Sequence, residues 1–171
     1  MTDPMSVRSA WTRGWVALLC VAACVGCAMP IRGRVVDAAT GQPLAGVAVL
    51  GVWLRIPELP GLQHKHELVG VTETQTDANG RFTLPRPQGN ANEEGVTVYK
   101  FGYVVWSNLL VFPTFARRPS QRVPSMVALQ PFPPEQNHRD QASFISMLTL
   151  GYASMQHAPY FYNAIRQESR Q

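Results

Sequence analysis

The chain has 171 residues, of which 46% are apolar, and this length suits one domain with a hydrophobic core and a short appendage. The formal net charge of +4 is too small for a nucleic-acid-binding protein, and no stripe of Lys and Arg interleaved with aromatic residues occurs, so we expect no nucleic-acid partner. Fourteen prolines and thirteen glycines lie between short apolar runs, which favours many short strands joined by turns.

Residues 1–23 are typical of an export signal that ends at a lipid-bearing cysteine. Two arginines precede the apolar run VALLCVAACVGCA, which is shorter than the roughly 20 residues that span a bilayer. The segment VAAC, ending at Cys24, resembles the bacterial lipobox, in which the cysteine is diacylated and becomes the first residue of the mature chain. Cys27 in CVGC is a second candidate, with a signal of residues 1–26. An ordinary cleaved signal that contains cysteines is the alternative.

A lipid on either cysteine would hold the protein on a membrane, because each buried methylene contributes about 0.8 kcal/mol. Val25 or Ala28, and not Asp, follows the candidate cysteines. By resemblance to Gram-negative sorting, this predicts the outer membrane, with the protein facing the periplasm. All three cysteines lie near the N-terminus, so we expect no disulfide framework in the folded part.

The folded part opens with IRGRVVDAATGQPLAGVAVLGVWL, two strand-like runs around a polar interruption. Asp37, Thr40, Gly41 and Pro43 supply turn chemistry there, since Asp bonds the backbone ahead, Gly permits positive φ and Pro fixes φ. We therefore predict two strands joined by a tight reversal.

The stretch TDANGRFTL, residues 76–84, predicts a second turn followed by a half-buried strand. We expect Asp77 to accept hydrogen bonds from the backbone amides of Asn79 and Gly80, while Gly80 takes the positive φ that re-enters the strand. A calcium loop would need further oxygen ligands and a later glycine, so a structural turn is favoured.

The run VTVYKFGYVVWSNLLVFPTF is rich in β-branched and aromatic residues, with a glycine that suggests a bulge or bend. Alternation places Tyr99, Phe101 and Tyr103 on one face of a strand, and we expect this face to pack in the core against Trp53 and Phe82. The alternative is an exposed ligand surface, formed by Trp53, Tyr103 and Trp106. With VPSMVALQPF as the last strand, residues 31–130 predict a mainly β fold, an antiparallel sandwich of about seven strands.

The composition changes over residues 134–171, where a short helical hairpin is predicted. Apolar residues recur there at three- and four-residue spacing, which is one face of a helix: Phe144, Met147, Leu148, Tyr152 and Met155. A second helix is expected to have Pro159 in its first turn. The polar faces carry too few Lys and Arg for a helix that lies on a membrane surface.

Together these motifs carry a family resemblance. GRVVDAATGQPLAGVAV, then TDANGRFTL, then VTVYKFGYVVW resembles the carboxypeptidase regulatory-like domain over about residues 31–129, with Val47 in place of the commoner Ala. The resemblance implies a transthyretin-like (prealbumin-like) β-sandwich without catalytic machinery. It also implies that the Asp, Thr and Gly residues of both motifs form turns.

Metal and nucleophile chemistry find little support in the sequence. His64 and His66 share one face of an extended segment and could hold an ion with a third ligand, for which the candidates are Glu73, Asp77, His138 and His157. A solvated loop is the favoured interpretation of the two histidines, and we expect no metal and no cofactor. No G-x-S-x-G motif is present, so an enzyme is not expected.

The function that best fits these observations is a non-catalytic envelope lipoprotein that acts as a binding or structural module at the periplasmic face. Besides the membrane, its expected partner is another envelope protein, peptidoglycan or a glycan. The alternatives are a carbohydrate-binding module that uses exposed aromatic rings and a small metal-dependent hydrolase built on the histidine pair.

Overall fold

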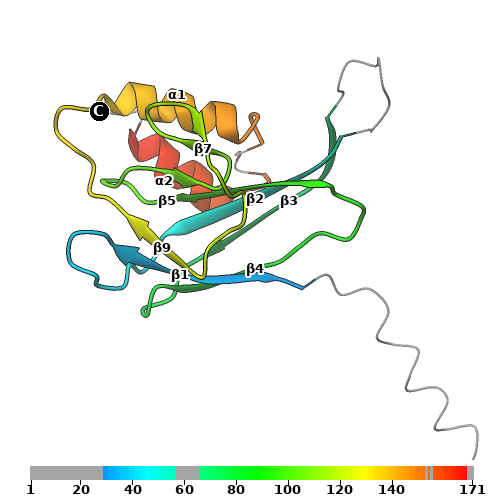
Figure 1. Ribbon diagram of the computed structural model, residues 1–171, viewed down its shortest axis with the longest axis horizontal. Coiled ribbons are helices and arrows are strands. Elements are labelled where there is room, and N and C mark those ends of the chain that lie inside the picture. The colour runs from blue at the N-terminus through cyan, green and yellow to red at the C-terminus, as the bar shows by residue number, and fades with distance from the viewer. Residues whose placement is uncertain (1–28, 57–65, 153, 155, 169–171) are drawn as a thin grey trace, which may run out of the picture.

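The computed structural model describes residues 29–56, 66–152, 154 and 156–168, and these form two packed β-sheets with a pair of helices on one side (Figure 1). The first sheet has the strand order β4-β1-β9, with β1 at Ile31–Asp37, β4 at Arg81–Leu84 and β9 at Met126–Leu129. The predicted signal and both candidate lipid-bearing cysteines lie outside the described residues.

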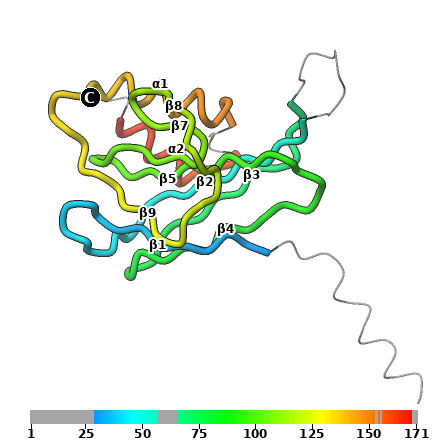
Figure 2. The backbone as a smooth tube through the Cα atoms, in the orientation of Figure 1, coloured from blue at the N-terminus to red at the C-terminus, as the bar shows by residue number. Residues whose placement is uncertain are grey.

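The second sheet has the strand order β3-β2-β5-β6. Its strands are β2 (Ala48–Arg55), β3 (Glu67–Gln75), β5 (Glu93–Tyr99) and β6 (Trp106–Ser107). A separate two-stranded ribbon pairs β7 (Leu110–Val111) with β8 (Ala116–Arg117) and lies close to α1 (His138–Leu148), as Figure 2 shows. The two larger sheets contain seven strands, which confirms the predicted mainly β sandwich.

Two features of the topology differ from the prediction. The first strand pairs with β9 in parallel, whereas the other strand pairs of the described residues are antiparallel. The predicted tight reversal after Asp37 does not form a hairpin, because β1 and β2 belong to different sheets and only Val36 and Pro43 form a bridge there. The turn therefore carries the chain from one layer of the sandwich to the other.

Strand β2 lies at the centre because both of its faces are apolar. Its odd-numbered residues, such as Val49 and Trp53, face the first sheet and pack with Phe82. Its even-numbered residues, such as Leu50 and Leu54, face the helices. Alternation along one strand thus divides the core into two layers. Each layer stabilises the fold by about 25 cal/mol for every Å² of apolar surface that it removes from water.

The helices cover the outer face of the second sheet (Figure 1), and the second helix, α2, spans Pro159–Glu168. Phe144 and Leu148 are buried as the helical spacing predicts, and Pro159 begins α2 as expected. Met147 remains exposed, and Tyr152 lies beyond the end of α1 although it packs partly buried against the same cluster. Met155 lies outside the described residues.

An acidic side chain of β3 fixes the start of α2. Both carboxylate oxygens of Glu73 accept hydrogen bonds, from the backbone amides of Tyr160 and Phe161 at 3.1 Å each. These amides belong to the first turn of the helix, which has no acceptor of its own there. The helical hairpin is therefore tied to the sheet by polar contacts as well as by its apolar face. In the part of the chain that the structure describes, no helix has the length and apolar character needed to span a membrane.

Candidate functional site

The Asp37 motif is a structural turn, as predicted. The Asp37 carboxylate accepts hydrogen bonds from the amides of Ala39 at 2.8 Å and Thr40 at 2.9 Å, and Gly41 has a φ of 71°. The hydroxyl of Tyr103 donates to the second carboxylate oxygen at 2.9 Å. The carboxylate is therefore fully engaged in holding the connection between the two sheets.

These contacts lower the pKa of the Asp37 carboxyl below its usual range, mainly through the Thr40 amide and then through the Tyr103 hydroxyl. A lowered pKa in the folded chain means that the carboxylate stabilises the fold above its unfolded pKa of about 3.9. That stabilisation is lost as the pH falls through the folded pKa.

We expect Asp37→Asn to reduce the loss of unfolding free energy as the pH falls from 7 to 3. The asparagine still offers an oxygen to the two amides, but it does not titrate. Urea unfolding at pH 7 and at pH 3 should show a smaller loss of stability on acidification in the variant than in the wild type. An equal loss in both proteins would contradict the assigned role of the carboxylate.

The Asp77 motif forms the second turn, with one change from the prediction. The Asp77 carboxylate accepts from the amides of Asn79 and Arg81 at 2.8 Å each, instead of Asn79 and Gly80. The Gly80 amide donates to the backbone oxygen of Asp77 at 2.9 Å, and Gly80 has the predicted positive φ, at 72°. The turn therefore uses Oδ1 of Asp77 to accept two backbone amides.

The three aromatic residues considered as a ligand surface do not form one. Trp53 is only 2% exposed and lies between the sheets. Tyr103 is tied to Asp37, and the guanidinium of Arg118 covers the Trp106 ring at 5.0 Å from its centroid. Trp53 is buried because β2 is covered on both faces, so its side chain has no route to solvent.

The predicted alternation of Tyr99, Phe101 and Tyr103 also fails, because β5 ends at Tyr99. Gly102, with a φ of 83°, turns the chain there. Tyr99 packs edge-on against Phe161 of α2, with centroids 6.1 Å apart, and it lies in the helix-side core instead of beside Trp53 and Phe82.

The candidate metal ligands are dispersed. His64 lies outside the described residues, and His66 is exposed directly before β3. The proposed third ligands have other partners: Glu73 caps α2, Asp77 forms its turn, His138 meets Glu168, and His157 meets Ser154. Over the described ranges, no three side chains of His, Cys, Asp or Glu come together in a way that could hold a metal ion.

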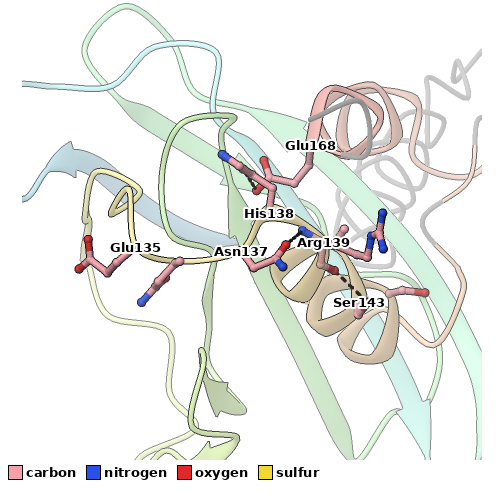
Figure 3. Close-up of a pocket in the computed structure, with 9 residues that line it drawn as sticks. Glu135, Asn137, His138, Arg139, Ser143 and Glu168 are labelled. Atoms are coloured by element: carbon pink, nitrogen blue, oxygen red, sulfur yellow. Dashed lines mark hydrogen bonds and ion pairs between the residues drawn. The ribbon is translucent and has the colours of Figure 1, made fainter.

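A polar hollow of about 860 Å³ lies beside the first half of α1 (Figure 3). At its edge, the buried carboxylate of Glu168 meets the His138 ring, with 2.7 Å between Nδ1 and Oε1. Gln141 Nε2 donates to the same oxygen at 2.8 Å, and the Tyr99 hydroxyl donates to the other oxygen. Sequence reasoning missed this network, because Glu168 is separated from its partners by 27 to 69 residues.

The His138–Glu168 pair resembles the orienting half of a hydrolytic triad, which would also need a nucleophile hydrogen-bonded to the imidazole. The hydroxyl of Ser143, further along α1, instead donates to the backbone oxygen of Arg139 at 2.9 Å (Figure 3). The His138 ring is stacked on Phe132, with centroids 4.3 Å apart. The network therefore fits a role in joining the two helices to the sheet.

An apolar groove of about 310 Å³ lies on the other side of α1, where the helix ends. Its walls come from the second sheet, the β7–β8 ribbon and the last turn of α1. The apolar lining residues are Val52, Leu54, Leu109, Leu110, Met147, Leu148 and Leu150. Four polar side chains stand around it: His66, Glu93, Arg117 and Gln121. A cavity of this size with an apolar lining and few polar groups is the usual form of a small-ligand site.

Two large apolar residues have unusual backbone conformations: Leu150, which lines the groove, and Phe115, which lies in the connection between β7 and β8. Leu150 has a φ of 50° and is 53% exposed, and Phe115, which contacts Phe144, has a φ of 58° and is 52% exposed. Leu150 follows the C-cap of α1, a position where Gly or Asn is preferred because it requires this φ. An exposed leucine at a position that favours Gly or Asn makes Leu150 a candidate contact residue of the groove.

The Arg117 guanidinium has no ion pair or hydrogen bond among the described residues, and Glu93 has none for its carboxylate. Three of the four polar side chains at the rim carry N–H donors, and only Glu93 is purely an acceptor when ionised. The groove lining thus combines apolar side chains with polar groups that are mostly hydrogen-bond donors.

Comparison with known proteins gives no relative: no family model, no curated protein and no solved structure matches this chain.

Proposed function

We propose that this protein is a non-catalytic envelope lipoprotein that acts as a binding module at the periplasmic face of the outer membrane. The lipobox-like segments ending at Cys24 and Cys27 support the anchor, and the resemblance to the carboxypeptidase regulatory-like domain supports a transthyretin-like module without catalytic residues. The observation that carries the proposal is the apolar groove between the second sheet, the β7–β8 ribbon and α1.

The ligand that fits this groove is a single-chain amphiphile with a negatively charged head. The aliphatic side chains of Leu54, Leu110 and Leu150 offer an alkyl chain an apolar surface to pack against. Arg117 and Gln121 stand where the head would emerge, and a guanidinium binds a carboxylate or phosphate through charge-assisted hydrogen bonds. Glu93 at the same rim disfavours a second negative group.

The anchor would assist such binding. A module held on a membrane meets molecules of that membrane at an effective concentration far above their concentration in solution. The apolar side chains of another envelope protein are the second kind of occupant that the groove could accept. The carbohydrate alternative is not favoured, because Trp53 is buried and Trp106 is covered by Arg118.

We expect the protein to bind dodecanoate, measured by displacement of a fluorescent undecanoate. Leu150→Asn should weaken binding about tenfold, since burial of a leucine side chain is worth about 1.5 kcal/mol or more. Its thermal stability should be kept or raised, because Asn adopts positive φ more readily than Leu. This variant therefore separates loss of the site from loss of the fold.

Arg117→Gln should weaken dodecanoate by about tenfold or more and leave dodecanol unchanged, because only the carboxylate gains a charge-assisted hydrogen bond. Arg139→Gln, a change of the same charge at an exposed position of α1, is the matched control and should bind like the wild type. Equal affinities of the wild type, Arg117→Gln and Arg139→Gln for dodecanoate would overturn the groove as the ligand site. Tighter binding of dodecylamine than of dodecanoate would overturn the negative head.

A further inference from the structure

A basic concavity of about 560 Å³ lies at the end of the sandwich where the described chain begins. Three arginines from three separate segments line it: Arg32 of β1, Arg86 of the connection between β4 and β5, and Arg122 of the segment before β9. Glu94, which pairs with Arg86, is the one acidic residue in this lining. Three positive groups against one negative group leave the lining with a net charge of +2.

The first described residues line the same concavity. Met29 is 82% exposed, and Pro30 and Ile31 follow it along the wall. An exposed apolar side chain beside clustered arginines is the composition of a surface that meets lipid headgroups.

If Cys24 or Cys27 carries the lipid, the few residues between that cysteine and Met29 place this surface beside the bilayer. Met29 is two residues after Cys27 and five after Cys24. An extended chain spans at most about 3.3–3.6 Å per residue, so the concavity lies within about 7–18 Å of the lipid-bearing cysteine. The headgroup layer on each side of the hydrocarbon core is itself about 5–7 Å thick.

We propose that the concavity of Arg32, Arg86 and Arg122 is the face that the protein turns toward the membrane, where it binds the phosphates of anionic phospholipids. This inference rests on the proposed lipid anchor and adds an orientation to it. Guanidinium groups suit phosphate oxygens because their N–H donors match them in pairs. The arginines would thereby hold the described sandwich in one orientation on the bilayer.

The test uses the lipidated protein purified from membranes and reconstituted into vesicles of phosphatidylcholine alone, or of phosphatidylcholine and phosphatidylglycerol in equal parts. Hydroxyl-radical oxidation of Met29, read by mass spectrometry, reports whether this end is covered. Tyr160, which is exposed on α2, is the internal reference. We expect the ratio of docked to undocked protein to rise about a hundredfold in the anionic vesicles, with Met29 protected accordingly.

Arg32→Gln, Arg86→Gln and Arg122→Gln together should remove this extra protection, and so should high salt, because exposed charges are screened. The control combines Arg81→Gln, Arg139→Gln and Arg166→Gln, which changes the net charge equally at positions outside the concavity. It should keep the protection. Equal protection of Met29 in neutral and anionic vesicles, or equal loss in both triple variants, would overturn the proposed face.

Different results would contradict the lipid anchor and the basic face. The mass of the N-terminal peptide shows whether Cys24 or Cys27 carries acyl chains, and flotation with phosphatidylcholine vesicles shows whether they hold the protein. A protein without acyl chains that does not float would overturn the anchor. A lipidated protein that floats but gains no protection from anionic lipid would overturn only the basic face.

Discussion

Glu168→Ala should lower the free energy of unfolding by about 3–5 kcal/mol, because it removes the shared acceptor of a buried network. The carboxylate lies fully inside the molecule and takes hydrogen bonds from the Tyr99 hydroxyl and the Gln141 amide, beside the His138 ring. Burial, and then the neighbouring Glu168, raise the pKa of the Tyr99 hydroxyl, so it remains a donor at neutral pH. Without the carboxylate, buried donors lose their partner.

The matched control for this prediction is Gln167→Ala, the preceding residue of α2, which is exposed. It removes a polar side chain of the same length from the same helical turn and should cost less than about 0.5 kcal/mol. Urea unfolding at pH 7 measures both variants. Similar stabilities of the two variants would show that the network does not hold α2 on the sheet.

Gly80→Ala should destabilise the fold by about 2–5 kcal/mol, well beyond the usual cost of an alanine at positive φ. A methyl group built at Gly80 lies 2.3 Å from the backbone oxygen of Val35, which belongs to the neighbouring strand β1. The same oxygen accepts the amide of Leu44 at 3.0 Å, so it has little freedom to retreat.

Gly41→Ala is the control, because Gly41 has nearly the same φ, 71° against 72°, with no atom within 4 Å of the added methyl group. Only the conformational cost of about 1–2 kcal/mol remains there. The difference between the two variants, measured by urea unfolding, isolates the clash with β1. Equal losses would show that the close approach of the Gly80 turn to β1 relaxes without cost.

The turns and the strands were predictable because their signals are local. Asp37 and Asp77 each bond amides within four residues, so composition and spacing are enough to assign both. The sandwich could be predicted for the same reason, since each strand is a short apolar run between turn residues. The sheet assignment of β1 and β2 was not predictable, because a reversal between layers and a hairpin use the same turn residues.

The burial of Trp53 could not be predicted from the sequence, because β2 is apolar at nearly every position and shows no alternation of apolar and polar residues. Glu168 gave no signal because a charged residue at the end of an amphipathic helix is normally solvated. The groove was also out of reach, since its walls join β2, β5, the β7–β8 ribbon and α1, which are distant in sequence. The one local sequence signal near the groove is Leu150, a leucine followed by glycine just after α1 ends.

The first two residues of β5 belong to different surfaces: Glu93 lines the apolar groove, and Glu94 lines the basic concavity. Consecutive residues of a strand point to opposite faces, so a single peptide unit separates the two surfaces. A substitution at one position therefore alters the chemistry on its own side of the sheet and leaves the other side untouched. If the groove binds the proposed amphiphile and the concavity binds phosphates, ligand affinity and membrane orientation can be changed separately by substitutions at two adjacent positions.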